Sequence, residues 1–86
     1  MKLIVREENY VHTLNFNSFQ LDEFDGRYEI WMNNLSILFK RFTDPFIAEY
    51  VFNLICEYIN TDKIFYLKTE EEYKAELKEF EKIFKE

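Results

Sequence analysis

The chain has 86 residues, enough for one domain with a small hydrophobic core. Its 17 Asp and Glu residues outnumber its 11 Lys and Arg residues, and the net charge of −6 disfavours direct binding to nucleic acid or to an anionic membrane. Ten Phe, six Tyr and one Trp compensate for the small core, because each buried ring removes about 150–250 Å² from water. The composition predicts a compact acidic domain packed with aromatic rings, whose best partner would be a basic protein.

The sequence carries no signal for export or membrane insertion. The apolar run at residues 3–5 is too short for the core of a signal peptide, and no stretch approaches the roughly 18 uncharged apolar residues of a membrane-spanning helix. A single cysteine, Cys56, excludes an internal disulfide. We therefore expect a cytoplasmic protein, and the richness in Lys, Glu, Ile, Asn, Phe and Tyr indicates a low-GC genome.

Four pairs of turn-forming residues recur in the first half of the chain: Glu8-Asn9, Asn17-Ser18, Asp25-Gly26 and Asn33-Asn34. Asp-Gly is a strong hairpin signal, because both central positions of the favoured turn need positive φ. In a two-residue hairpin the residues that flank the turn face each other. The predicted pairs are Phe16 with Phe19, Leu14 with Leu21, Phe24 with Arg27, Asp22 with Glu29, Met32 with Leu35, Ile30 with Ile37 and Tyr28 with Phe39.

This pairing gathers apolar residues on one face of the predicted sheet. The face contains Leu3, Val5, Leu14, Phe16, Phe19, Leu21, Tyr28, Ile30, Met32, Leu35, Ile37 and Phe39. A register shift of one residue would scatter them over both faces, so the pattern predicts an antiparallel meander of four or five strands. Residues 35–42 also fit helical spacing, and we favour a strand for them.

A first helix is predicted over residues 45–60. Asp44 can cap its N-terminus, and Pro45 suits its first position. Its apolar face is wide and its polar stripe is narrow, which is typical of a mostly buried helix. The apolar face of the sheet is its natural partner, and a short extended segment follows at residues 63–68.

A second helix is predicted over residues 69–85. Thr69 and Glu72 have the spacing of a capping box at its start. The large apolar residues of one side are Tyr73, Leu77, Phe80 and Phe84. The whole chain, residues 1–86, is therefore predicted to be one α+β domain: an antiparallel meander followed by two helices with an extended segment between them.

Few residues are available for catalysis or cofactor binding. Gly26 is the only glycine and belongs to a turn, so the chain has no phosphate-binding loop. His12 and Cys56 lie on separate predicted elements, without the spacing of a metal site. His12 faces Glu23 in the predicted register, where a hydrogen-bonded pair at the rim is favoured over an acid–base pair, and Cys56 is interpreted as a packed helix residue. We expect no enzymatic activity, no cofactor and no metal.

The opposite face of the predicted sheet mixes rings with charges. Asp22 faces Glu29 across a hairpin, and like charges directly opposite each other are destabilising. We expect Arg27 and Lys40 to compensate them, in a charged surface cluster rather than a catalytic pair of carboxylates.

Aromatic anchors ringed by charges are typical of protein-interaction patches. The candidate partner-binding residues on this face are Asp22, Phe24, Asp25, Glu29 and Trp31. Coverage of the face by the second helix, or its burial in a homodimer, is the favoured structural interpretation, and an exposed binding patch is the functional one.

A secondary acidic patch, Glu70, Glu71 and Glu72, begins the second helix. Together with the acidic hairpin it suggests a DNA mimic, in which carboxylates replace phosphates. We favour the plainer interpretation that these acids suit the positive end of the helix dipole.

The favoured function is that of a small non-enzymatic inhibitor, encoded by a phage or mobile element, which blocks a larger basic nucleic-acid-binding host protein such as a defence nuclease in the host cytoplasm. Its size and acidity are similar to those of anti-CRISPR proteins and host-takeover factors, without a shared motif. It would act as a monomer or homodimer, with no direct nucleic-acid or membrane binding. The alternative is a homo-oligomeric structural or assembly protein of a low-GC bacterium or phage, and an enzyme is the least supported function.

Overall fold

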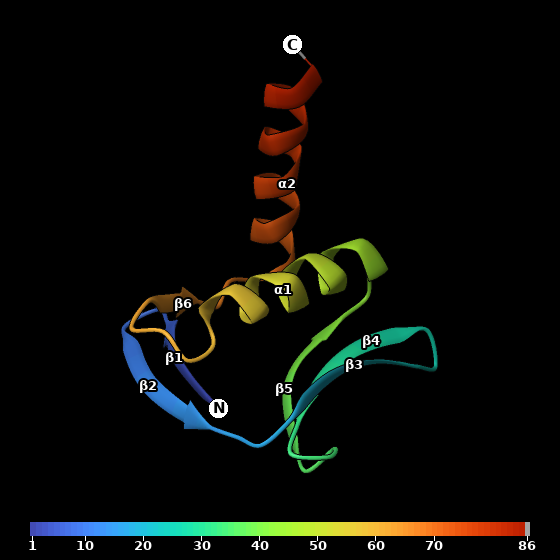
Figure 1. Ribbon diagram of the computed structural model, residues 1–86. Coiled ribbons are helices and arrows are strands. Elements are labelled where there is room, and N and C mark those ends of the chain that lie inside the picture. Colours follow the sequence, from blue (N-terminus) through green and yellow to red (C-terminus); the bar gives the residue numbers. More distant parts are fainter. Residues whose placement is uncertain (86) are drawn as a thin grey trace.

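The chain has an α+β fold with five strands in its N-terminal half (Figure 1). The computed structural model describes the backbone of residues 1–85 and the side chains of residues 1–80. In chain order the elements are β1 (Lys2–Glu7), β2 (Tyr10–Asn15), β3 (Phe19–Phe24), β4 (Arg27–Met32), β5 (Ile37–Phe42), α1 (Pro45–Tyr58), β6 (Ile64–Tyr66) and α2 (Glu70–Lys85). The predicted α+β class, both helices and the extended segment between them are confirmed. Within the described residues, no helix is long and apolar enough to cross a membrane.

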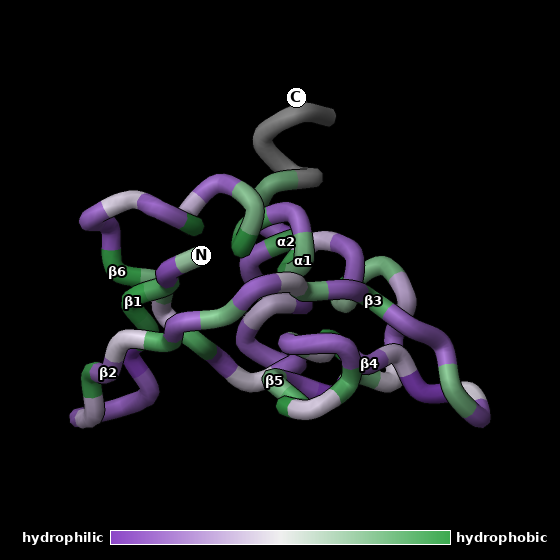
Figure 2. Tube along the Cα trace, turned by 60° about the horizontal axis from the view of Figure 1, so that its bottom comes forward, coloured by the Kyte–Doolittle hydropathy of each residue, from purple (hydrophilic) through white to green (hydrophobic). Residues whose placement is uncertain are grey.

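The strands are divided between two three-stranded sheets. In the first sheet β1 pairs antiparallel with β2 and parallel with β6, and Figure 2 shows β6 beside the hydrophobic middle of β1. In the second sheet β4 pairs antiparallel with β3 and β5. The turns predicted at Glu8-Asn9 and Asp25-Gly26 join their strands as expected, because Glu7 faces Tyr10 and Phe24 faces Arg27.

The hairpin predicted at Asn17-Ser18 is wrong, because β2 and β3 belong to different sheets. The Phe16 N–H donates to the Met1 carbonyl at 2.9 Å, and the Asn17 N–H donates to the side-chain oxygen of Asn33 at 2.7 Å. The Ser18 carbonyl accepts from the Asn33 N–H at 2.9 Å. With its backbone groups bound in this way, the segment crosses from one sheet to the other instead of reversing.

The register between β4 and β5 also differs from the prediction. The turn spans residues 33–36 instead of two asparagines, so Met32 faces Ile37. Leu35 lies in this turn with a φ of 69° and is 54% exposed, outside the apolar face to which it was assigned. The segment that also fitted helical spacing is a strand, β5, as favoured.

A register shift between β4 and β5 then changes which residues of β5 face the core. Phe42, predicted on the opposite face, lies across from Tyr28 and is 1% exposed. Lys40 lies across from Ile30 on the core side, and Arg41 takes the place on the outer face that the prediction assigned to Lys40.

α1 begins at the predicted cap. The Asp44 side chain accepts hydrogen bonds from the backbone N–H groups of Phe46 at 2.9 Å and Ile47 at 3.4 Å, and Pro45 is the first helical residue. The helix ends at Tyr58, slightly before the predicted boundary. It packs on the β3–β4–β5 sheet, and its buried residues are Ile47, Ala48, Val51 and Ile55.

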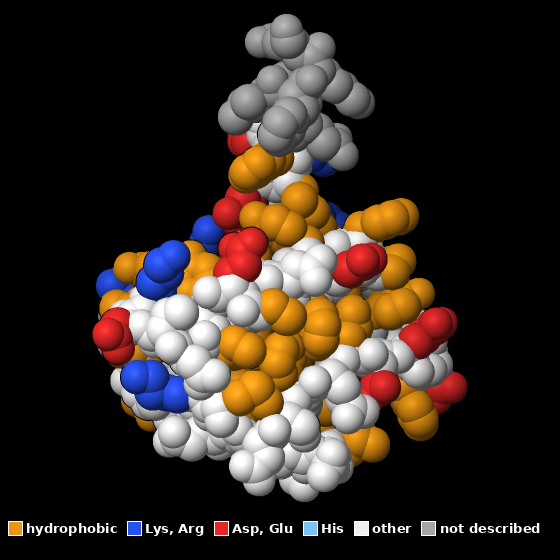
Figure 3. Space-filling view, viewed as in Figure 1, with side chains coloured by type: hydrophobic (Ala, Val, Ile, Leu, Met, Phe, Trp, Pro, Cys, Tyr) orange, Lys and Arg blue, Asp and Glu red, His pale blue; other side chains and the backbone are white. Residues whose placement is uncertain are grey.

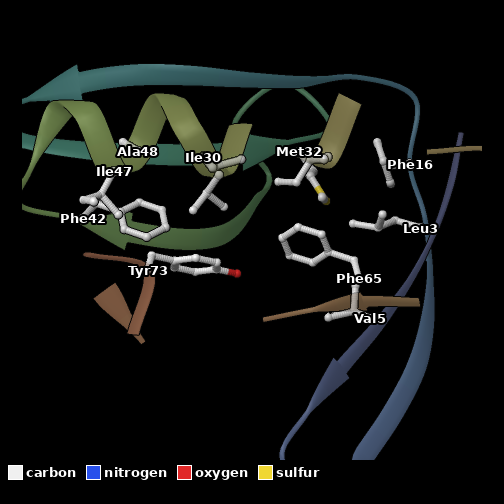
Figure 4. Close-up of a cluster of buried hydrophobic side chains, with 12 residues drawn as sticks. Leu3, Val5, Phe16, Ile30, Met32, Phe42, Ile47, Ala48, Phe65 and Tyr73 are labelled. Atoms are coloured by element: carbon white, nitrogen blue, oxygen red, sulfur yellow. The ribbon is translucent and has the colours of Figure 1, made fainter. Parts of the chain in front are cut away.

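The core lies between α1 and the two sheets. Figure 4 shows Phe65 of β6 and Tyr73 of α2 beneath side chains of the second sheet, among them Ile30 and Met32. The buried apolar residues are Leu3, Val5, Phe16, Ile30, Met32, Phe42, Ile47, Ala48, Val51, Ile55, Phe65 and Tyr73.

α2 begins with the predicted capping box. The Thr69 N–H donates to the Glu72 carboxylate at 3.1 Å, and the Glu72 N–H donates to the Thr69 hydroxyl at 3.2 Å. Tyr73 anchors the helix in the core, where it is 1% exposed. Its hydroxyl donates to the Tyr66 carbonyl at 2.9 Å and accepts from the Lys68 N–H at 3.2 Å.

Beyond this anchor, α2 rises from α1 on the side away from the β3–β4–β5 sheet (Figure 1). Its predicted coverage of the outer sheet face is therefore wrong. Leu77 packs partly buried against the core, and Phe80 is 51% exposed. Phe84, expected on the same side of the helix, lies outside the residues whose side chains are described.

Candidate functional site

The outer face of the β3–β4–β5 sheet, which points away from α1, contains a groove of about 450 Å³. We call it the outer groove; its lining residues are Gln20, Asp22, Glu23, Phe24, Glu29, Trp31 and Leu35. The alternation of side chains along β3 and β4 places most of them on one face. Leu35 comes from the turn between β4 and β5, and the sequence prediction missed it because it assumed a shorter turn.

Two aromatic rings and Leu35 form the apolar part of the outer groove. Phe24, at the end of β3, is 62% exposed, and Trp31 is partly exposed on the central strand β4. Trp31 lies between Gln20 on β3 and Leu38 on β5 in the sheet register. A ring held on the central strand of a sheet presents a fixed surface, so it loses little conformational entropy when a partner binds.

Asp22 and Glu29 face each other across the β3–β4 hairpin, as predicted. Each of the two carboxylates accepts hydrogen bonds from its own partners. The Gln20 amide donates to Asp22 at 2.6 Å. Glu29 is 5% exposed and accepts from Arg41 Nε at 2.6 Å and from Trp31 Nε1 at 3.3 Å. Glu29 therefore orients the tryptophan ring, and its charge is neutralised within the protein.

Arg41, rather than the predicted Lys40, compensates Glu29. The hydrogen bond from Arg41 holds the pKa of the Glu29 carboxyl below its ordinary value of 4.5 against the opposing effect of burial, with smaller contributions from Trp31 and Arg27. Because the unfolded chain lacks this partner, the ion pair adds stability above pH 4.5 that is lost as the pH falls through the lowered pKa.

Acidification from about pH 6 to about pH 3 is therefore expected to lower the urea midpoint of the native protein more than that of a Glu29→Gln variant, which lacks this titration. Urea unfolding followed by Trp31 fluorescence at each pH measures the difference. Glu49→Gln, which removes an exposed carboxylate of α1, is the control and is expected to follow the native curve. Parallel curves for Glu29→Gln and the native protein would contradict the assigned role of Glu29.

The acidic residues at the tip of the hairpin remain available to a partner. Asp22, Glu23 and Asp25 form no ion pair among the described side chains. Figure 3 shows acidic side chains gathered at the right-hand end of the molecule, over the β3–β4 hairpin, beside exposed apolar side chains. The outer groove thus combines exposed rings with negative charge that the described residues leave unpaired.

The residues of the secondary acidic patch form hydrogen bonds and an ion pair within the fold. Glu70 accepts from the Thr43 hydroxyl at 2.8 Å and from the backbone N–H of Asp44 at 2.9 Å. Burial raises the pKa of Glu70, but its hydrogen bonds with Thr43 and Asp44 outweigh burial and hold it below the ordinary value. Glu72 closes the capping box, and Glu71 lies 3.7 Å from the Lys74 ammonium. These carboxylates stabilise the start of α2 and are not brought together with the outer groove.

The remaining candidate residues do not form a reactive site. The predicted pairing of His12 with Glu23 is wrong, since His12 faces Val5 in the first sheet and its ring packs edge-on against Tyr10 with centroids 4.9 Å apart. Cys56 is exposed on α1, so its interpretation as a packed residue is also wrong. Among the described residues, no group of three His, Cys, Asp or Glu side chains is placed to hold a metal ion.

Comparison with protein-family models, with curated proteins and with solved structures finds no match to this chain. The geometry of the outer groove is therefore the observation from which a function can be proposed. Of the five partner-binding residues predicted from the sequence, Asp22, Phe24, Glu29 and Trp31 line the groove, and Asp25 lies in the adjoining turn.

Proposed function

We propose that the protein is a non-enzymatic inhibitor that binds a larger, basic, nucleic-acid-binding protein through the outer groove. The observation that carries the proposal is a sheet face that no described element covers, on which Trp31 and the 62% exposed Phe24 adjoin carboxylates without an ion-pair partner among the described side chains. Aromatic side chains in a concave surface are the usual anchors of protein interfaces, and the surrounding charge selects the partner.

The charge of the β3–β4 hairpin supports a basic partner. Asp22, Glu23 and Asp25 are offset locally only by Arg27, so three carboxylates against one guanidinium leave a charge of −2. Glu29 is already neutralised by Arg41. The net charge of −6 over the whole chain acts in the same direction and would speed association with a positively charged surface.

Inhibition follows from the kind of surface that such a partner must present. A protein that binds nucleic acid exposes Lys and Arg side chains to neutralise phosphates. An acidic domain seated on that surface competes with the nucleic acid, which suits a phage- or mobile-element-encoded factor acting on a defence nuclease in the host cytoplasm. Mimicry of a regular phosphate ladder is not required, because the groove offers rings as well as charges.

Affinity capture from a bacterial lysate, followed by a binding assay with the purified captured protein, tests the proposal. Trp31→Ala and Asp22→Lys are each expected to weaken binding at least about tenfold, since one removes the anchor and the other reverses the charge at the groove. Added nucleic acid is expected to compete with the protein for its partner.

Tyr66→Ala is the matched control, because Tyr66 is a 51% exposed ring in the other sheet. This variant is expected to bind like the native protein. Unchanged binding by both Trp31→Ala and Asp22→Lys would show that the outer groove is the wrong surface, and a captured partner that nucleic acid does not displace would contradict inhibition.

A homo-oligomeric structural or assembly protein is the second candidate. The observation that favours it is the edge strand β2, which exposes Tyr10 (63%) and Val11 (50%) in the order β2-β1-β6. Unpaired strand edges with apolar side chains promote association between copies of a chain. Size-exclusion chromatography with light scattering over a wide concentration range decides this, because a monomer at every concentration would contradict self-assembly.

A further inference from the structure

β3 is the edge strand of the second sheet and borders the outer groove. We propose that its free edge binds an extended basic segment of the partner protein as a fourth strand, so that backbone hydrogen bonds as well as side chains hold the complex. This inference rests on the proposed function and specifies how the same site engages its partner. Addition of a strand to a sheet edge is an established way of recognising extended peptides.

The hairpin geometry identifies which backbone groups of β3 are free. Asp25 and Gly26 both have positive φ, 50° and 75°, as in a two-residue turn whose flanking residues share both hydrogen bonds. Phe24 and Arg27 are therefore a hydrogen-bonded pair, and every second pair follows. The residues whose N–H and C=O groups point away from β4 are Phe19, Leu21 and Glu23.

These outward groups have no occupant in the described structure. The neighbouring strand of β3 is β4 alone, and no hydrogen bond outside the strand ladder reaches the backbone of Phe19, Leu21 or Glu23 from any described residue. A free edge of six residues can form several new hydrogen bonds, which is enough to hold an extended peptide.

β3 lacks most of the features that protect sheet edges. Natural edges are shielded by Pro, bulges, short length or charged side chains, especially Lys, and of these β3 has only the carboxylates of Asp22 and Glu23. The opposite edge, β5, has an irregular register and carries Lys40 and Arg41, and β6 is only three residues long. β3 has six residues in unbroken register with β4 and contains neither Lys nor Pro. Its edge is therefore open to a further strand.

Charge decides between the possible occupants of this edge. Asp22 and Glu23 project to opposite faces of the sheet near the end of β3, with Asp25 in the turn, so an added strand meets carboxylates on both of its faces. A second copy of β3 would bring its own Asp22 and Glu23 to the same edge, which like-charge repulsion disfavours. The fitting occupant is an extended segment of alternating apolar and basic residues. Its apolar side chains lie on the outer face beside Trp31, and its basic side chains lie on the other face, where they meet Glu23.

A capped heptapeptide of alternating Lys and Val, added to the full-length protein, tests strand addition by amide hydrogen exchange in NMR. Saturating peptide is expected to slow exchange at Phe19, Leu21 and Glu23 by about tenfold or more, because their N–H groups become hydrogen-bonded. The same peptide N-methylated at every residue keeps its charge but loses the N–H donors of both edges, and it is expected to give no such protection.

A pair of variants gives an independent measurement. Glu23→Pro removes an outward N–H at an exposed position, which edge strands tolerate, and Glu23→Gln removes the same charge but keeps the N–H. Glu23→Pro is expected to bind the heptapeptide at least about tenfold more weakly than Glu23→Gln.

Three results would overturn strand addition: binding of the heptapeptide without protection of Leu21 and Glu23, equal binding by the two variants, or no binding of the heptapeptide at millimolar concentration. None of these results would contradict the proposed function. That proposal is contradicted separately if Trp31→Ala and Asp22→Lys leave binding of the captured partner unchanged.

Discussion

Replacement of Phe65 by alanine is expected to lower the free energy of unfolding by about 3–5 kcal/mol. Phe65 is 2% exposed, and its ring contacts those of Phe39 and Tyr58, with centroid distances of 6.3 and 5.7 Å. The ring thus connects β6 of the first sheet with β5 of the second and with α1. A domain of this length has a total stability of roughly 4–13 kcal/mol, so the variant would be close to unfolding.

Urea unfolding followed by circular dichroism measures this loss. Tyr66→Ala is the control on the same strand, since its ring is 51% exposed and contacts the Arg6 guanidinium at 5.6 Å. It is expected to cost less than about 1 kcal/mol. Equal losses for the two variants would contradict the placement of Phe65 between the sheets and would mean that β6 contributes by its backbone pairing alone.

The second large effect is expected at alkaline pH and comes from Tyr73. Burial raises the pKa of Tyr73 to about 12, from an ordinary value of 10.0, and the hydrogen bond from Lys68 opposes that rise. The buried phenol is favoured in its neutral form, so its contribution to stability is complete below pH 10 and is lost as the pH rises through about 12. A shift of about two units corresponds to about 2–3 kcal/mol of stability lost over this interval.

Urea unfolding of the native protein and of Tyr73→Phe at several pH values between about 9 and 12 isolates this contribution. At neutral pH the variant is expected to lose about 1–3 kcal/mol, because the Lys68 N–H and the Tyr66 carbonyl lose their partner. Above about pH 10 the stability of the native protein is expected to fall toward that of the variant. If the difference between them stays constant up to pH 12, Tyr73 is not buried as described.

Local sequence signals predicted the helices well, because their determinants lie within a few residues of one another. Asp44 with Pro45, and Thr69 with Glu72, are complete N-terminal caps whose hydrogen bonds need no distant partner. The Asp25-Gly26 turn is likewise local, since both residues tolerate the positive φ that the hairpin requires. This turn placed β3 and β4 in the correct register.

Errors arose where a distant contact chose between local possibilities. Asn17-Ser18 could form a tight turn, but hydrogen bonds to Asn33 hold this segment as a crossing between the sheets. The turn that begins at Asn33 has four residues instead of the predicted two. The irregular register of β5 then places Phe42 in the core and Arg41 on the outer face. Side-chain alternation along the strand did not reveal the shift, because one extra residue reverses every assignment beyond it.

The residues of the candidate site also divide into those that local sequence signals predicted and those that depend on distant contacts. Asp22, Phe24, Glu29 and Trp31 were assigned to one face by the β3–β4 hairpin alone, and they line the outer groove. Leu35 and the partnership of Arg41 with Glu29 depend on the turn and register of β5, so the sequence did not reveal them. Whether the face was covered depended on the direction of α2, which the Tyr73 anchor and the contacts of Glu70 determine.

The sequence by itself determined the class of fold, the start of each helix, the central hairpin and the meeting of rings with carboxylates on one sheet face. These features depend on alternation, capping and turn chemistry, all of which act over a few residues. Only the tertiary structure decided that the strands divide into two sheets, that Arg41 neutralises Glu29 and that α2 leaves the outer groove open. Those outcomes depend on packing between residues far apart in the chain, because Phe65 and Tyr73 fill the space between elements that no local pattern brings together.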